Sequence, residues 1–143
     1  MTRPVHPAAE VPAESWLLRA VPALPVLGVP RAVEFYEQRL GFRRVFADDG
    51  YGIVQRDQVE IHLWAANGPP GSGAEPHLAG TASCRVQVGR IDGLYDEYRG
   101  QDVLHARGEL AAQPWGTREF AVVDLDNNLL TFFEPTGNGS GST

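Results

Sequence analysis

The order of secondary-structure signals in this chain occurs twice along its length, and this repeat is what most restricts the fold. The first copy starts with the apolar run LLRAVPALPVLGV (17–29), whose prolines Pro22 and Pro25 cannot donate ladder hydrogen bonds. This run therefore predicts an edge strand, or a strand that leaves its own sheet. PRAVEFYEQRLGF (30–42) follows, with proline in the first turn, apolar residues at helical spacing and a glycine stop, which predicts an amphipathic helix.

Three short strand-like runs complete each copy. In the first copy they are FRRVFADD (42–49), YGIVQRD (51–57) and VEIHLWAA (59–66). After a Gly/Pro-rich linker, the second copy predicts a strand at 82–89, a helix at 90–101 and strands at 103–110, 117–126 and 128–135. We therefore predict an α+β fold made of two tandem βαβββ modules.

The domain boundaries follow from the composition of the segments between these elements. Residues 1–15 have no periodicity and predict a flexible arm, and residues 136–143 predict a flexible tail. The domain between them spans 16–135, and it divides into module one (about 19–65), the linker (66–80) and module two (about 81–135). The whole chain has the length of one ordinary domain.

The charge balance and the cysteine content exclude several classes of partner. With 12 Lys and Arg against 18 Asp and Glu, the net charge of −6 has the wrong sign for nucleic-acid binding but attracts a cationic ligand. Cys84 is the only cysteine, so it forms no intramolecular disulfide, and we expect it to be a small buried side chain. No apolar stretch is long enough to span a bilayer, so we expect no membrane partner and a cytoplasmic location.

Several stretches resemble the bleomycin-resistance proteins, a branch of the vicinal oxygen chelate superfamily that also includes glyoxalases and extradiol dioxygenases. The stretches are AVPALPVLGVPRAVEFYEQRLGF, LYDEY and, most specifically, QPWGTREFAVVDLDNNLLTF, and the resemblance covers about residues 19–134. It implies that the two modules form a cup-shaped mixed sheet. It also implies a homodimer built by exchange of the N-terminal arm, with two drug clefts along the interface. The function it implies is sequestration of a bleomycin-class glycopeptide antibiotic, which gives drug resistance.

Enzymes of this superfamily hold a divalent metal through His and Glu side chains, and the resemblance places the four ligand positions at Val21, His62, Ser83 and Thr131. Three of these residues are poor ligands, so we expect no metal, no cofactor and no catalysis. Metal would enter only inside a chelating drug. The alternative is a metal-dependent lyase or dioxygenase with displaced ligands, such as His62, Glu60 and His105.

Aromatic residues near the predicted strand ends are the main candidates for ligand contact. Trp115 is the strongest, because Pro114 and Gly116 hold it in a turn, where a purely structural tryptophan is less expected. A flat ligand would stack on it. The other predicted binding residues are Tyr51, Phe46, Asp48, Asp49, His62, Trp64, Glu119 and Arg118.

Each of these residues also has an alternative role. Phe46 would equally suit core packing, Asp48 and Asp49 would equally suit a solvated turn, and Arg118 with Glu119 would suit an exposed ion pair. Asn127 takes the place of the family's glycine in the last turn, where asparagine tolerates a left-handed backbone. Two other functions remain open: binding of another flat natural product, and docking of a partner protein, which would require an exposed apolar patch.

Overall fold

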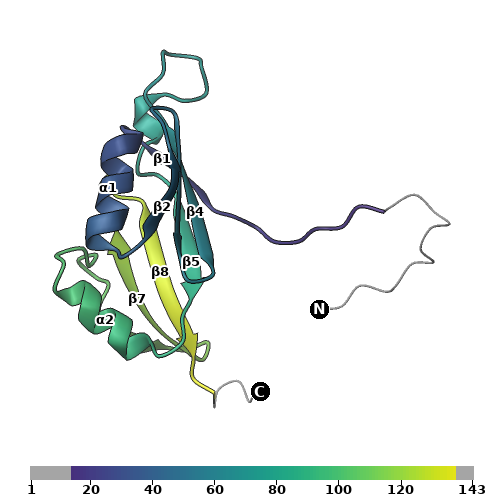
Figure 1. The fold of residues 1–143 in the computed structure, drawn as a ribbon. Helices are drawn as coiled ribbons and strands as arrows, with labels where there is room; N and C mark the ends of the chain where they lie inside the picture. Colours follow the sequence, from purple (N-terminus) through teal and green to yellow (C-terminus); the bar gives the residue numbers. More distant parts are fainter. Residues whose placement is uncertain (1–13, 138–143) are drawn as a thin grey trace.

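A computed structural model of the chain describes residues 14–137, and these residues form two consecutive βαβββ modules around one hydrophobic core. Module one contains β1 (Ala23–Val26), α1 (Val29–Arg39), β2 (Arg43–Ala47), β3 (Tyr51–Arg56) and β4 (Val59–Ala65). Module two contains β5 (Ser83–Gln87), α2 (Ile91–Arg99), β6 (Ala111–Gln113), β7 (Thr117–Val123) and β8 (Leu129–Pro135). A short 3-10 helix, η2 (Pro76–Leu78), lies in the linker. The predicted α+β fold and its order of elements are confirmed (Figure 1).

Each module forms its own mixed four-stranded sheet, and the strand orders are β1-β4-β3-β2 and β5-β8-β7-β6. The first strand of each module runs parallel to the last, and the remaining pairs are antiparallel. β1 is an edge strand, as its prolines predict. It nevertheless pairs with β4 of the same chain from Ala23 to Val26, so departure from the sheet applies only to the residues before it.

The predicted strand at 103–110 is wrong, because this segment contains a turn. Gly108 donates its N–H to the carbonyl of His105 (2.8 Å), and Arg107 donates its N–H to Nδ1 of the same histidine (3.0 Å). The turn interrupts pairing with β7, leaving a single bridge between Leu104 and Val122. The strand next to β7 is β6, which lies immediately after this segment.

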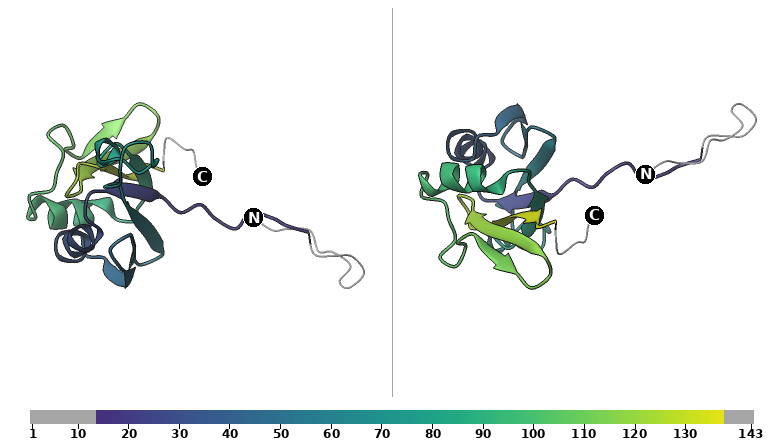
Figure 2. Two further views of the ribbon diagram at one scale, coloured as in Figure 1. Left: turned by 90° about the horizontal axis from the view of Figure 1, so that it is seen from above. Right: turned by 90° about the horizontal axis from the view of Figure 1, so that it is seen from below.

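The helices cover one face of each sheet and leave the other face uncovered (Figures 1 and 2). In β4, the buried residues Ile61 and Leu63 face α1, while Glu60, His62 and Trp64 alternate onto the other side. In β7, Phe120 and Val122 are buried on the side of α2, and Thr117, Glu119 and Ala121 lie on the other side. We call the uncovered side of each sheet its open face.

Buried polar contacts join the two modules. Asn128, which is fully buried, donates its side-chain amide to the carbonyl of Pro25 at 2.8 Å and accepts the N–H of Ala82 at 3.1 Å. The hydroxyl of Tyr36 on α1 donates to Asp124 after β7, at 2.8 Å. Burial, followed by the charge of Asp124, raises the pKa of Tyr36 well above its usual value. These bonds fix the end of β1 against the β7–β8 turn.

Asn127 lies in the β7–β8 turn, and Cys84 lies on β5. Asn127 has φ 80°, which confirms the left-handed conformation expected of it. Cys84 is free and lies partly buried against the core, and burial raises the pKa of its thiol to about 11.

Residues 14–22 form an extended segment that leaves the body just before β1 (Figure 1). We call these residues the arm segment. It exposes three large apolar side chains, Trp16 (51%), Leu17 (97%) and Leu18 (83%). Most of the predicted flexible arm (1–13) and of the tail (138–143) lies outside the described residues. Within residues 14–137, no helix is long and apolar enough to cross a membrane.

Candidate functional site

Trp115 stands in the turn between β6 and β7, with its indole at the surface. Gly116, in a left-handed conformation (φ 92°), closes the turn by donating its N–H to the carbonyl of Gln113 at 3.1 Å. The tryptophan side chain is 64% exposed, so it is not a core residue. Its indole N–H donates to the carboxylate of Glu119 at 2.9 Å. The ring is therefore exposed and also held in one orientation.

The carboxylate of Glu119 on the open face of β7 collects four hydrogen bonds. Arg85 donates through both terminal nitrogens (3.1 and 2.6 Å), Thr117 donates its hydroxyl (2.6 Å), and Trp115 donates its indole N–H. Glu119 is only 7% exposed. The Arg85 guanidinium, and after it the hydroxyl and indole donors, lower the pKa of Glu119 to about 2, although burial opposes this shift. Glu119 is thus a charged anchor for Trp115.

Arg85 extends this arrangement across the sheet. Its guanidinium carbon lies 4.6 Å from the ring centroid of Phe133 on β8, and its side chain is 49% exposed. Cation–π contact and the two bonds to Glu119 fix the position of the guanidinium. Trp115, Glu119, Arg85 and Phe133 together form what we call the Trp115 platform, in which Trp115 and Arg85 are accessible and Glu119 is buried.

The open face of module one carries a hydrogen-bonded chain of side chains. The hydroxyl of Tyr51 lies 2.7 Å from Nδ1 of His62, and Nε2 of His62 lies 2.6 Å from Glu60. A carboxylate only accepts, so Nε2 of His62 is the donor to Glu60. Glu60 also pairs with Arg19 of the arm segment at 3.2 Å, and the His62 and Arg19 contacts lower the pKa of Glu60. The root of the arm segment is thereby attached to this face.

The other predicted site residues of module one lie near the hydrogen-bonded side chains of Tyr51, His62 and Glu60. Phe46 pairs with Ile53, which pairs with His62, so all three lie on the open face; Phe46 is 47% exposed rather than buried in the core. Trp64 pairs with Tyr51 on the same face, and its indole N–H lies 3.4 Å from the carbonyl of Ala23.

The acidic loop before β3 has a local structural role. Asp48 accepts the N–H groups of Gly50 (2.8 Å) and Tyr51 (2.9 Å), which folds the turn. Asp49 is exposed, and its side chain makes no hydrogen bond or ion pair within residues 14–137. Of the two carboxylates, Asp49 is the one available to a cationic ligand.

Arg118 lies apart from the rest of the predicted set. It points to the opposite side of β7 from Glu119, where it makes two bonds of 2.8 Å with Asp92 of α2. Adjacent residues in a strand point to opposite faces, so Arg118 and Glu119 do not flank a single groove. His105 lies in the 105–108 turn, where its Nδ1 accepts a backbone N–H. Residues 14–137 contain no group of three His, Cys, Asp or Glu side chains that could hold a metal ion.

Comparison with known proteins places this geometry in a family. The family model described as Glyoxalase/Bleomycin resistance protein/Dioxygenase superfamily matches residues 19–139. The chain belongs to this superfamily. Among curated relatives, a bleomycin resistance protein of Geobacillus stearothermophilus is 41% identical, over 82% of this chain and 97% of the relative. A bleomycin resistance protein of Klebsiella pneumoniae is 34% identical, over 81% and 91%.

A solved structure shows the same fold with a ligand. The bleomycin-binding protein of Streptomyces verticillus, crystallised with copper(II)-bleomycin, aligns with a TM-score of 0.69 and 26% identity. The alignment covers 83% of this chain and 97% of that protein. The resemblance inferred from the WGTREF stretch and its neighbours is therefore confirmed.

Sequence reasoning missed three members of these open faces: Arg85, Thr117 and Phe133. The alternation of side chains along the predicted strands can be read from the sequence. What the sequence does not show is that β5 and β7 both flank β8, which brings Arg85 and Glu119 within bonding distance across that strand. Glu60, which the sequence offers only as a displaced metal ligand, pairs in the structure with His62 and Arg19.

Proposed function

We propose that this superfamily member binds and sequesters a bleomycin-class glycopeptide antibiotic without chemically changing it. The observation that carries the proposal is the Trp115 indole, exposed yet held by the carboxylate of Glu119. A flat aromatic surface that is already oriented loses little conformational freedom when a planar group stacks on it. The relatives named as bleomycin resistance proteins, and the relative crystallised with copper(II)-bleomycin, support this choice of ligand.

The chemistry of the open faces suits the parts of such a drug. Its flat bithiazole would stack on the Trp115 platform. Its cationic tail would be attracted by the net charge of −6, and Asp49, whose carboxylate has no partner among residues 14–137, lies two residues before Tyr51. Its chelating head carries any metal, so the protein itself needs no ligand set.

Replacing Trp115 with alanine should weaken bleomycin binding by about 1–3 kcal/mol, because the stacking surface is removed. Trp115→Phe, which keeps an aromatic face, should lose less. Isothermal titration with wild type and both variants measures this effect, and thermal unfolding checks that each variant is folded. Mass spectrometry of the recovered drug tests the absence of catalysis. If a folded Trp115→Ala protein kept full affinity, or if the drug came back modified, the proposal would fail.

We also propose that the functional unit is a homodimer with two drug sites, in which the arm segment packs on a second copy of the chain. Leu17 and Leu18 are almost fully exposed, and burying each against a partner would contribute about 1.5–3 kcal/mol. A second copy on the arm segment would also supply further walls around the open faces, where Trp115 is 64% exposed in the single chain.

Light scattering should therefore give a dimeric mass at micromolar concentration, with saturation at two bleomycin molecules per dimer. The double variant Leu17→Ser/Leu18→Ser should shift the protein toward the monomer and weaken drug binding together. The matched control is Leu125→Ser, which removes another exposed leucine, 42% exposed, away from the arm segment. A monomeric wild type, or one drug per two chains, would argue against this assembly.

A further inference from the structure

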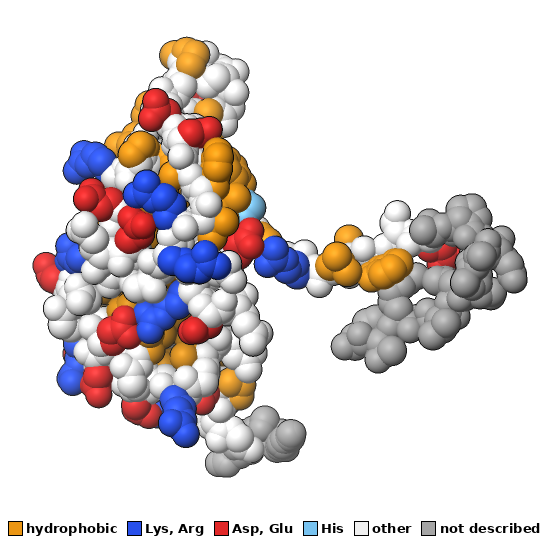
Figure 3. Space-filling view, in the orientation of Figure 1, with side chains coloured by type: hydrophobic (Ala, Val, Ile, Leu, Met, Phe, Trp, Pro, Cys, Tyr) orange, Lys and Arg blue, Asp and Glu red, His pale blue; other side chains and the backbone are white. Residues whose placement is uncertain are grey.

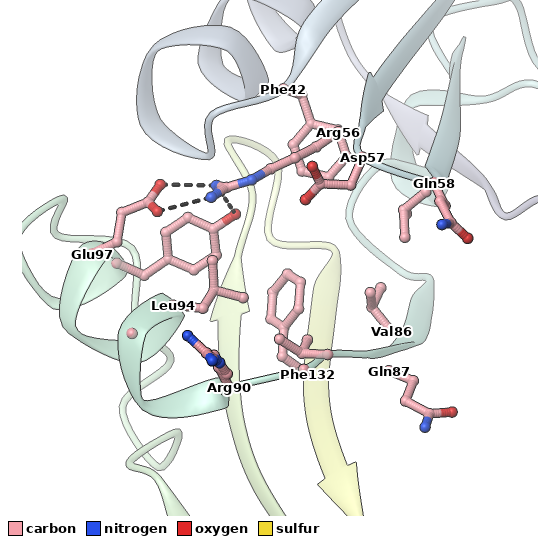
Figure 4. Close-up of a pocket in the computed structure, with 15 residues that line it drawn as sticks. Phe42, Arg56, Asp57, Gln58, Val86, Gln87, Arg90, Leu94, Glu97 and Phe132 are labelled. Carbon is pink, nitrogen blue, oxygen red and sulfur yellow. Dashed lines mark hydrogen bonds and ion pairs between the residues drawn. The ribbon is translucent and has the colours of Figure 1, made fainter.

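A cavity of about 450 Å³ lies between the two modules, on the side of the molecule that carries α2 (Figure 4). Module one contributes the β3–β4 turn to it, and module two contributes β5, the start of α2 and β8. The volume is within the range of small-molecule sites, roughly 300–1,000 Å³. Neither Trp115 nor Tyr51 lines it, so it is separate from the open faces.

The floor of this cavity is apolar. Phe42, Val86, Leu94, Tyr98 and Phe132 line it, and the rings of Tyr98 and Phe132 are 5.5 Å apart in a tilted pair. In the space-filling view, apolar atoms are visible in the lower half of the body between charged side chains (Figure 3). An aromatic or branched aliphatic group would be buried on this floor.

Two opposite charges on the cavity wall are unpaired. Arg56 is already paired, since it makes two bonds to Glu97 (2.8 and 2.9 Å), one to the carbonyl of Leu40 (2.9 Å) and a longer one to the hydroxyl of Tyr98 (3.4 Å). In contrast, the side chains of Arg90 and Asp57 make no hydrogen bond or ion pair within residues 14–137. Figure 4 shows them at opposite ends of the cavity, Arg90 at the start of α2 and Asp57 in the β3–β4 turn.

Two residues of the cavity wall, Arg90 and Gly93, reduce the stability of the folded protein. Arg90 has φ 59°, a left-handed conformation that costs a residue with a Cβ about 1–2 kcal/mol and costs glycine almost nothing. Gly93 is the third residue of α2, in its first turn, and glycine is a poorer helix former than alanine. A Cβ at Gly93 would meet no atom within 4 Å, so packing does not require glycine there. A binding site would explain both residues: Arg90 places a cation on the cavity wall, and Gly93 leaves the entrance of the cavity open.

We propose that this cavity is a second binding site, for a small amphipathic anion with an aromatic body. The body lies on Leu94 and Phe132, a carboxylate or sulfonate pairs with Arg90, and a hydrogen-bond donor at the far end meets Asp57. This site is independent of the Trp115 platform and of the antibiotic proposed to bind there.

The test uses two probes with the same aromatic body. 8-Anilinonaphthalene-1-sulfonate carries the anion, and N-phenyl-1-naphthylamine lacks it; both report binding by fluorescence. Arg90→Gly should weaken the sulfonate about tenfold, as expected for loss of a charge-assisted contact, and should leave the neutral probe unchanged. Arg107→Gln, an exposed cation outside the cavity, makes the same charge change and should affect neither probe.

Gly93→Leu should close the entrance and abolish binding of both probes. Both test variants are expected to fold, because glycine suits the backbone at position 90 and leucine suits a helix better than glycine does. Thermal unfolding at or above the wild-type temperature verifies this. NMR shifts caused by the sulfonate probe should include the amides of Gly89 and Gly93.

Three results would overturn the proposal. They are equal sulfonate affinity in wild type and Arg90→Gly, binding that persists in Gly93→Leu, and complete displacement of the probe by bleomycin. The last result would place the probe on the drug site.

Discussion

Replacing Glu119 with glutamine is expected to lower the free energy of unfolding at pH 7 by about 2–4 kcal/mol. The carboxylate accepts four hydrogen bonds, whereas a glutamine amide turns an N–H₂ group toward a donor it cannot accept from. Three of the four bonds end on Oε2, where the oxygen of glutamine could still accept them, while the N–H₂ group would face Nη1 of Arg85. The negative charge that pairs with the Arg85 guanidinium would be lost. Urea unfolding measures the loss, and Glu109→Gln, an exposed carboxylate, is the control, with an expected change below about 0.5 kcal/mol.

The same variant has a pH signature with a defined sign. The pKa of Glu119 in the folded state is about 2, below its ordinary value of 4.5. Its stabilising contribution is therefore complete above about pH 4.5 and is lost as the pH falls toward 2. The difference in stability between wild type and Glu119→Gln should shrink across this window. A difference that stayed constant down to pH 2 would show that the charge of Glu119 is not what stabilises the Trp115 platform.

Replacing Asn128 with alanine should destabilise the protein by about 3–4 kcal/mol. The change leaves the N–H of Ala82 without a partner and removes a bond to Asp124. It also removes one of the two donors to the buried carbonyl of Pro25, which keeps only the N–H of Gly80. These groups belong to β1, to the entry of β5 and to the β7–β8 turn, so the joint between the modules loosens as a whole. Thermal and urea unfolding report this as one cooperative loss.

The neighbouring asparagine provides the matched comparison. Asn127 has φ 80°, so Asn127→Gly relieves a left-handed backbone and should change stability by less than about 1 kcal/mol, in either direction. Similar losses at positions 127 and 128 would mean that the turn conformation, rather than the buried amide, joins the modules.

Most of the fold could be predicted from local patterns. Both helices and the strands β2 to β5, β7 and β8 lie within a few residues of their predicted positions, because proline, glycine and the apolar spacing mark their ends. The predicted run at 17–29 contains β1 (Ala23–Val26) but is much longer than the strand. β6 was misplaced because VLHARGEL has strand-like composition, while its turn depends on Gly108 packing directly against β7. A Cβ at Gly108 would lie 2.3 Å from the carbonyl oxygen of Ala121. No local pattern reveals such an approach.

The candidate site was predictable in part. Trp115 could be identified because Pro114 and Gly116 predict a turn, and the structure leaves its side chain exposed. From the sequence, Glu119 could be identified only as a residue of the strand that follows Trp115, and not as the hydrogen-bond partner of its indole. That Glu119 is an anchor shared with Arg85 depends on the register of β5, β7 and β8, which residues distant in sequence set together.

By itself, the sequence determined the two-module fold, the turn that exposes Trp115 and the excess of negative charge. These depend on residues close together in the chain and on composition. Three other features depend on the tertiary structure. Arg118 faces away from Glu119, and Glu60, His62 and Tyr51 are linked by hydrogen bonds. Arg90 and Asp57 lie at opposite ends of a cavity. Hydrogen bonds and ion pairs act over a few ångströms, so which polar groups meet is set by strand register and by the contact between the modules.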